Sequence, residues 1–312
     1  MRIAVAARSF ARNATLRAEL TARYPDATFA ESPELLDGDA LVAFLRGHDH
    51  AIIGLERVDA QVLDAVPELR VISKYGVGLD GLDIAALRTR GIKLGWTGGV
   101  NRRSVAELTL AFAIALLHRV PETAFAMRQG EWQKLLGRQL TGRTVGIIGI
   151  GFVGKELVRL LAPFECRILS HDIRGYPDFH RQFGVTAVSK IELLRESDIV
   201  TLHIPLDHST RGMIGAAELA AMKRGSFLIN AARGGLVDET ALAEALERQH
   251  LAGAACDVFE VEPAANRRLS ALPTFLGTAH IGGSTIEAQL AMGRAAIDGL
   301  TTARLPTDDW PC

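Results

Sequence analysis

Short apolar runs alternate with segments of helical period along the first hundred residues of the chain. The apolar runs at 3–7, 51–55 and 69–73 have the length of buried strands. They are followed by segments with apolar residues at helical spacing, at 14–23, 59–65 and 82–90. This alternation is typical of βαβ units and predicts a doubly wound parallel sheet.

The alternation resumes at residue 144 and predicts a second parallel sheet. Strands are expected at 144–148, 166–169, 199–204, 227–230, 253–259 and 274–277, and helices at 190–195, 216–222 and 239–249. The helix expected at 285–302 has no place in a completed second sheet, so we expect it to return to the first one. The fold class is therefore α/β, with a domain at 101–284 inserted into a discontinuous domain formed by 1–100 and 285–312.

Two segments between the sheets have patterns of their own. Residues 104–120 are apolar almost all round, which is typical of a helix buried on every side. The segment 121–142 places Met127, Trp132 and Leu136 among charged residues. It fits either a dimerisation arm or a surface helix and loop of the same chain.

A glycine-rich motif joins the expected strand at 144–148 to a helical pattern. Its sequence is Gly149-Ile150-Gly151-Phe152-Val153-Gly154. In such a unit the first glycine makes a tight turn, the second lets the backbone approach a pyrophosphate, and the third allows close packing of helix on strand. The amides of the first helical turn, at Phe152 and Val153, can then hold the phosphates. The motif predicts a dinucleotide site.

An acidic residue follows this motif at the spacing that a ribose site requires. Asp172 lies 18 residues beyond the last glycine, where a carboxylate can accept hydrogen bonds from both hydroxyls of an adenosine ribose. The same carboxylate repels a 2′-phosphate, so the sequence favours NAD over NADP. Ile173 is expected to flank the cofactor, and Arg174 either softens the preference for NAD or is simply solvated.

Composition narrows the choice of partners. The 312 residues carry a formal net charge of −1, which gives no field to attract nucleic acid or an anionic membrane, so we expect a small-molecule partner. The longest apolar run, 108–117, is too short to span a bilayer, and the N-terminus has no signal-peptide pattern. Cys166, Cys256 and Cys312 are odd in number and widely spaced, which predicts neither a disulfide framework nor a metal site and favours the cytoplasm.

Polar side chains follow three expected strands of the second sheet, in the stretches 230–235, 257–263 and 280–283. Carboxyl ends of parallel strands meet at one edge, where ligands bind in open α/β sheets. Arg233 can bind a carboxylate in bidentate fashion, His280 can exchange a proton near neutral pH, and Glu262 can orient the imidazole. Taken alone, each of the three has the pattern of an ordinary surface or packing residue.

Taken together, these residues resemble the D-isomer-specific 2-hydroxyacid dehydrogenase family. The similarity runs from about residue 76 to residue 297, and its motifs are Gly76-Val77-Gly78-x-Asp80, Val105-Ala106-Glu107 and Asn230-x-x-Arg233-Gly234-Gly235-x-Val237-Asp238-Glu239. The run Gly283-Ser284-Thr285-Ile286-Glu287-Ala288-Gln289 is most similar to the phosphoglycerate dehydrogenase branch. Ala279 and Gly98 stand where the family usually has proline, and glutamate at 262 argues against the formate dehydrogenase branch.

The resemblance implies a Rossmann-like NAD domain, a flavodoxin-like substrate domain, a homodimer built around the NAD domains and a cleft that closes on substrate. It implies that Arg233 anchors the carboxylate and keto group of a 2-keto or 2-hydroxy acid, with His280 as acid and base and Glu262 as its partner. The residues implied around the rest of NAD are His203, Pro205, Thr210, Ala231, Ala232, Arg233, Asp257, His280 and Gly283. The residues expected around the substrate are Lys74, Tyr75, Gly76, Val77, Asn101, Arg233 and His280.

Two questions stay open at this stage. Lys74, Arg102 and Arg103 either recognise a second anionic group, such as the phosphate of phosphoglycerate or a phosphonate, or are ordinary solvated cations. The alternative to an enzyme is an NAD(H)-sensing binding protein, because co-repressors in the same family use this fold to recruit partners. A different NAD-using hydrolase needs further motifs in the substrate domain, and the sequence does not contain them.

Overall fold

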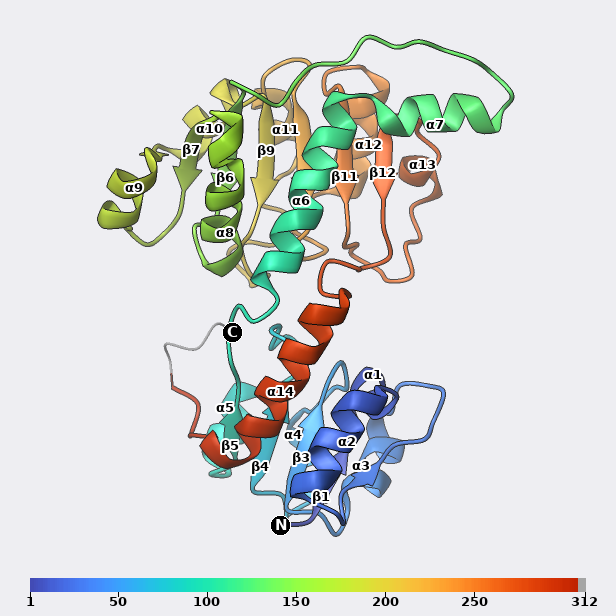
Figure 1. The fold of residues 1–312 in the computed structure, drawn as a ribbon, viewed down its shortest axis with the longest axis vertical. Coiled ribbons are helices and arrows are strands. Elements are labelled where there is room, and N and C mark those ends of the chain that lie inside the picture. The colour runs from blue at the N-terminus through green and yellow to red at the C-terminus, as the bar shows by residue number, and fades with distance from the viewer. Residues whose placement is uncertain (308–312) are drawn as a thin grey trace. The chain divides into compact units, whose positions relative to one another are not determined.

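The computed structural model describes residues 1–307, which divide into two compact units (Figure 1). Residues Arg102–Ser284 form the second unit, and Met1–Asn101 together with the chain from Thr285 onward form the first. The third cysteine, Cys312, lies outside the described residues. Each unit is a parallel sheet covered by helices.

The first unit contains a five-stranded parallel sheet in the order β2-β1-β3-β4-β5. This is the flavodoxin-like order, as expected. Its strands are β1 (Ile3–Val5), β2 (Thr28–Phe29), β3 (His50–Ile53), β4 (Val71–Lys74) and β5 (Lys93–Gly95). Its helices are α1 (Arg8–Ala11), α2 (Ala14–Arg23), α3 (Gly38–Leu45), α4 (Ala60–Ala65), α5 (Ile84–Thr89) and α14 (Ile286–Thr302).

Helix α14 returns to the first sheet, which confirms the discontinuous domain. The helix lies close to the sheet because glycines face each other: a Cβ on Gly95 of β5 would collide with the backbone of Gly299. Ser73 of β4 adds a buried hydrogen bond, in which its hydroxyl donates to the carbonyl of Ala296 at 2.6 Å. A side chain on either glycine would push the helix off the sheet.

The second unit contains a seven-stranded parallel sheet in the order β12-β11-β10-β9-β6-β7-β8. Read from the other edge, the first six strands have the Rossmann order 3-2-1-4-5-6. The strands are β6 (Thr144–Ile148), β7 (Arg167–His171), β8 (Thr186–Ala187), β9 (Ile199–Leu202), β10 (Phe227–Asn230), β11 (Gly253–Cys256) and β12 (Phe275–Gly277). The order reverses between β6 and β9, where ligands bind in such sheets.

Helices cover both faces of this sheet (Figure 1). They are α6 (Arg102–Leu117), α7 (Val120–Arg128), α8 (Phe152–Leu161), the 3-10 helix η1 (Ala162–Phe164), α9 (Pro177–Phe183), α10 (Lys190–Glu196), α11 (Ala216–Ala221), α12 (Glu239–Glu247) and α13 (Arg267–Ser270). Alternate residues of β10 enter different cores: Leu228 packs on one face and Ile229 on the other. Burial on both faces explains the uninterrupted apolar runs in the sequence.

Several elements differ from the sequence expectation. The strands β2, β5 and β8 were not expected, because two or three residues are too short to display a period. Helix α3 was not expected either. The strand expected at 253–259 ends at Cys256. The next residue, Asp257, is buried, and its carboxylate accepts a hydrogen bond from the amide of Gly282 in a later loop.

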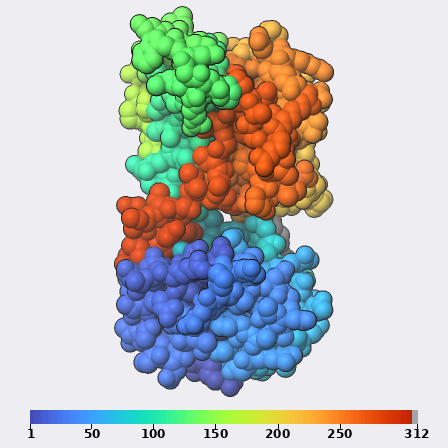
Figure 2. Space-filling model, turned by 90° about the vertical axis from the view of Figure 1, so that its right-hand side faces the viewer, coloured from blue at the N-terminus to red at the C-terminus, as the bar shows by residue number. Residues whose placement is uncertain are grey.

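The segment 121–142 forms α7 and then runs without regular secondary structure from residue 131 to 139. Figure 2 shows this part of the chain, in green, at the surface of the second unit. Trp132 is 79% exposed and Leu136 is 91% exposed.

No single helix among residues 1–307 is long and apolar enough to cross a membrane. Helices α6 and α7 together have the required length and composition, but the chain bends by 68° between them.

Candidate active site

The glycine motif forms the turn between β6 and α8. Gly149 has a φ of +98°, and a Cβ there would collide with the carbonyl of His203. A Cβ on Gly154 would collide with the carbonyl of Gly149, so this glycine permits the close approach of helix and strand. Nothing lies within 4 Å of the position where a Cβ on Gly151 would be. Backbone carbonyls therefore fill the space next to Gly149 and Gly154, whereas the space next to Gly151 is open and can accept a pyrophosphate.

The first turn of α8 leaves its backbone amides available. Gly151 is the N-cap and supplies no side-chain acceptor. Phe152 is 56% exposed, while Val153 packs against the core below the turn. Unpaired amides at the start of a ten-residue helix attract an anion, so Phe152 and Val153 are placed to contribute backbone groups.

Asp172 is held beside the glycine turn at the end of β7. Its Oδ2 accepts a hydrogen bond from the amide of Ile150 at 2.6 Å, and its Oδ1 accepts one from the amide of Arg174 at 2.8 Å. Each carboxylate oxygen has a further lone pair for a ribose hydroxyl. Ile173 is 99% exposed, and a cavity of about 270 Å³ beside Asp172 is lined by both residues and by Tyr176. These features fit the adenosine end of a dinucleotide.

The loop after β9 contains the predicted cofactor residues His203, Pro205 and Thr210. Burial of the His203 ring lowers its pKa to about 3, and the ring lies 3.1 Å from the hydroxyl of Thr201, so it is a neutral wall of the site. Thr210 differs from the expected phosphate contact. Its buried hydroxyl donates to the carbonyl of Pro205 at 2.9 Å and accepts from the amide of Asp207 at 2.8 Å, which closes the loop on itself.

Three neighbouring strands, β10, β11 and β12, lead to Arg233, Glu262 and His280. Backbone pairing continues past the strand ends. The amide of Asp257 donates to the carbonyl of Asn230 at 2.9 Å, and the amide of His280 donates to the carbonyl of Asp257 at 2.8 Å. The three polar stretches therefore leave the sheet at one edge, side by side.

Glu262 and His280 form a direct pair. The Nδ1 of His280 lies 2.9 Å from Oε2 of Glu262, and the other oxygen, Oε1, accepts from the amide of Phe259 at 3.1 Å. His280 has a φ of +53°, in the left-handed region that only a few per cent of non-glycine residues adopt. With Nδ1 directed at the carboxylate, Nε2 is left to exchange a proton with a ligand.

Asn230 shapes the loop that carries Arg233. The Asn230 side chain is buried at the end of β10, where its Oδ1 accepts from the amide of Ala232 at 3.1 Å and its Nδ2 donates to the carbonyl of Arg233 at 2.8 Å. The guanidinium of Arg233 donates to the carbonyl of Ala232 at 2.7 Å. Sequence reasoning gave Asn230 no role, although a polar residue that turns back on its own backbone after a strand is a recognisable signal.

Asp257, which was expected beside the nicotinamide, has a structural role in the loop that follows β12. Its carboxylate is almost completely buried, where it accepts hydrogen bonds from the Thr278 hydroxyl at 2.6 Å and from the amides of Ile281 and Gly282, both at 2.7 Å. It thereby holds the loop that contains His280. Thr278 was missed by the sequence analysis, because nothing in its spacing marks it.

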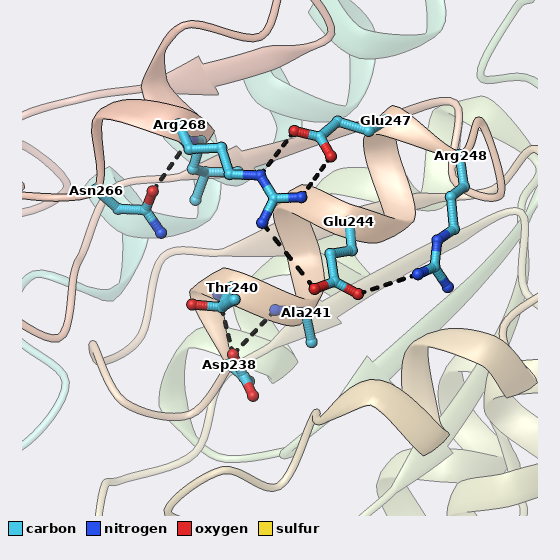
Figure 3. A network of polar contacts seen from close by, with 9 residues as sticks. Asp238, Thr240, Ala241, Glu244, Glu247, Arg248, Asn266 and Arg268 are labelled. Atoms are coloured by element: carbon cyan, nitrogen blue, oxygen red, sulfur yellow. Dashed lines mark hydrogen bonds and ion pairs between the residues drawn. The ribbon is translucent and has the colours of Figure 1, made fainter.

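The loop that carries Glu262 is anchored at both ends to α12. At its start, the amide of Glu260 donates to a carboxylate oxygen of Glu239 at 2.8 Å. At its end, Arg268 of α13 binds both oxygens of Glu247, at 2.8 and 2.5 Å (Figure 3). Asp238 caps α12 through the amides of Thr240 and Ala241, so both acids of the Asp238-Glu239 motif have structural roles.

The predicted substrate loops of the first unit follow β4 and β5. Lys74 is buried and its ammonium donates to the carbonyl of Gly54. The Tyr75 ring differs from the expected ligand contact, because it lies in the core, edge-on to Phe10 with ring centroids 5.6 Å apart. Gly76 has a φ of +119°. The carbonyl of Val77 accepts from the Trp96 indole at 3.0 Å, and Asn101 is buried with no partner for its Oδ1.

The two arginines at the start of α6 are directed at acidic residues of the second unit. Arg103 donates to Glu107 at 2.6 Å and to Glu156 at 2.9 Å, and Arg102 lies 3.8 Å from Glu156. Both arginines thus take part in ion pairs with acidic residues of α6 and α8. Among the residues described, no three His, Cys, Asp or Glu side chains gather in a way that could hold a metal ion.

Comparison with known proteins identifies the family of this chain. Residues 110–282 match the profile described as "D-isomer specific 2-hydroxyacid dehydrogenase, NAD binding domain". The chain belongs to the D-isomer specific 2-hydroxyacid dehydrogenases. Its second unit is accordingly the NAD-binding domain of this family, in agreement with the open turn at Gly151 and the ribose acceptor at Asp172.

Relatives within the family carry different names. A D-3-phosphoglycerate dehydrogenase of Methanocaldococcus jannaschii is 38% identical over 240 residues, which cover 76% of this chain and 46% of the relative. A hydroxypyruvate reductase of Thermotoga maritima is 35% identical over 83% of this chain and 86% of its own. The crystal structure of a glyoxylate reductase from Paecilomyes thermophila is similar with a TM-score of 0.85 and 28% identity, covering 96% of this chain and 93% of that one. The chain thus spans about half the length of the phosphoglycerate dehydrogenases that it matches.

Changing Glu262 to Gln tests whether this carboxylate controls His280. The carboxylate faces Nδ1 at 2.9 Å, so Glu262→Gln should leave the ring less well oriented and lower kcat for keto-acid reduction by about 10- to 100-fold. The measurement is kcat for reduction of a 2-keto acid, with Glu260→Gln as the control because Glu260 lies in the same loop and pairs with Arg211 instead. Equal kcat values for Glu262→Gln and the unaltered protein would count against the pairing.

Proposed function

We propose that this protein is an NAD-dependent dehydrogenase that interconverts a small 2-keto acid and its D-2-hydroxy acid. The observation that carries the proposal is the pairing of His280 Nδ1 with Glu262 at 2.9 Å, on the sheet edge that also presents Arg233. A dehydrogenase of this kind needs an acid and base, a group that orients it and a carboxylate anchor, and these three side chains supply them.

Each residue has a definite task in the proposed reaction. Bound NADH would supply the hydride that reduces C2 of the keto acid. His280 would donate a proton from Nε2 to the oxygen on C2, and Glu262 would hold the ring through Nδ1. Arg233 would bind the substrate carboxylate and stabilise negative charge that develops on the oxygen. The reverse reaction would use His280 as the base.

The proposed substrate class is an unphosphorylated 2-keto acid such as glyoxylate, pyruvate or hydroxypyruvate. Support comes from the cations that a second anionic group would need. Lys74 is buried and donates to the carbonyls of Gly54 and Tyr75, and Arg103 is paired with Glu107 and Glu156. Hydroxypyruvate and glyoxylate reductases are also among the relatives.

Replacing His280 tests the proposed chemistry. His280→Ala should lower kcat for keto-acid reduction by about 10²–10⁴-fold, because general acid–base catalysis typically contributes that much, while the affinity for NADH stays nearly unchanged. The rate is measured as NADH oxidation with a panel of 2-keto acids. The control is His118→Ala, which removes an exposed histidine directly after the end of α6. An inactive unaltered protein that still binds NADH would support the NAD-sensing alternative instead.

A comparison of substrates tests the proposed specificity. Hydroxypyruvate should give a higher kcat/KM than its phosphorylated counterpart. The reason is that backbone carbonyls already bind the ammonium of Lys74, and carboxylates already bind the guanidinium of Arg103. The two compounds differ only in the phosphate, so each is the control for the other. A clear preference for the phosphorylated compound would contradict the assignment and restore recognition of a second anionic group.

We also propose a homodimer that uses the segment 121–142. Trp132 and Leu136 are largely exposed, and Met127 on α7 is 61% exposed, which is unusual for large apolar side chains of one short segment. Replacing Trp132 and Leu136 with serine should convert a dimer into monomers in analytical ultracentrifugation. A monomeric unaltered protein would contradict the proposal.

The cytoplasmic setting stays a prediction from the number and spacing of the cysteines. The lack of a nucleic-acid or membrane partner stays a prediction from the formal net charge of −1.

A further inference from the structure

Ser104 forms a buried hydrogen bond that joins distant parts of the second unit. It lies in the first turn of α6, and its hydroxyl donates to the carbonyl of Gly282 at 2.5 Å. The two residues are 178 positions apart in the sequence. Ser104 is only 8% exposed, so its partner is a protein atom and not bulk solvent.

The peptide groups around Gly282 are held from two sides. Ser104 binds the carbonyl of Gly282, while the amide of Gly282 donates to Oδ2 of Asp257 at 2.7 Å. The amide of Ile281 donates to the other oxygen, Oδ1, also at 2.7 Å. A Cβ at position 282 would come within 2.9 Å of the Asp257 carboxylate, which explains why this position needs glycine. The backbone here has little freedom.

His280 depends on this fixed backbone for its orientation. It stands two residues before Gly282, with a φ of +53°, and its side chain is 48% exposed. Exposed ion pairs of this kind are weak, so the contact with Glu262 alone is a poor constraint on the ring. The 278–282 backbone therefore places the Cα of His280, and the contact with Glu262 orients the ring only if that backbone stays fixed.

We propose that Ser104 is a positioning residue for His280, acting through the carbonyl of Gly282. The proposal rests on the function proposed above for His280. Ser104 and Gly282 lie within three residues of the two ends of the second unit, Arg102 and Ser284. The hydrogen bond therefore ties together the points where the chain enters and leaves this unit, and connects both to the loop of the proposed acid and base.

Three variants separate positioning from general stability. Ser104→Ala removes the hydroxyl, and Ser104→Thr keeps it as a conservative replacement. Thr109→Val is the matched control, because Thr109 is also buried on α6 but donates to Val105 within the same helix. It loses a buried hydroxyl without touching the His280 loop.

The first measurement is hydrogen–deuterium exchange of the peptide that covers residues 278–284. Loss of the partner of a buried carbonyl costs enough to raise exchange of this peptide by about 10-fold in Ser104→Ala. Ser104→Thr should restore slow exchange, and Thr109→Val should leave this peptide unchanged. Equal exchange in Ser104→Ala and the unaltered protein would overturn the proposal, and this result does not depend on any enzymatic activity.

The second measurement is steady-state reduction of the best keto acid in the panel. A misplaced acid should lower kcat by about 10- to 100-fold in Ser104→Ala, with the KM for NADH unchanged. Faster exchange with an unchanged kcat would show that Ser104 only stabilises the loop, and would overturn the positioning role. An unaltered protein without turnover would refute the proposed function, and exchange alone would then decide whether Ser104 holds the loop.

Discussion

The hydrogen bonds that follow the ends of β10, β11 and β12 are the constraint on which the proposed site depends. The amide of Asp257 binds the carbonyl of Asn230, and the amide of His280 binds the carbonyl of Asp257. Because these bonds extend the pairing of parallel strands, three loops that are far apart in the sequence leave the sheet next to one another. The buried side chains of Asn230 and Asp257 then turn the backbone so that Arg233 and His280 project from it.

The cofactor end of the same sheet depends on close approach between backbones. Gly149 and Gly154 have no room for a side chain, whereas the space above Gly151 is open. Asp172 is fixed beside this turn by the amides of Ile150 and Arg174. The reversal of strand order between β6 and β9 puts this turn at the edge where the loops of the proposed catalytic residues begin. One sheet thus positions the dinucleotide and the proposed acid and base with respect to each other.

Much of this organisation was predictable from the sequence. The alternation of apolar runs and helical periods predicted two parallel sheets, and the lack of a place for 285–302 predicted the return of α14. The motif at 149–154 and Asp172 predicted NAD. Side-chain roles that arise from tertiary packing were not predictable. The burial of the Tyr75 ring, the pairing of Arg103 with Glu156 and the use of Asp257 as a loop anchor depend on neighbours that are remote in the sequence.

The most direct test of the account is a crystal structure of the protein with NAD and a non-reactive 2-keto acid analogue such as oxamate. The account predicts that Nε2 of His280 and the guanidinium of Arg233 both lie within hydrogen-bonding distance of the analogue, with its reactive carbon facing C4 of the nicotinamide. An analogue bound away from His280, while Glu262 still pairs with Nδ1, would contradict the proposed role of this edge of the sheet.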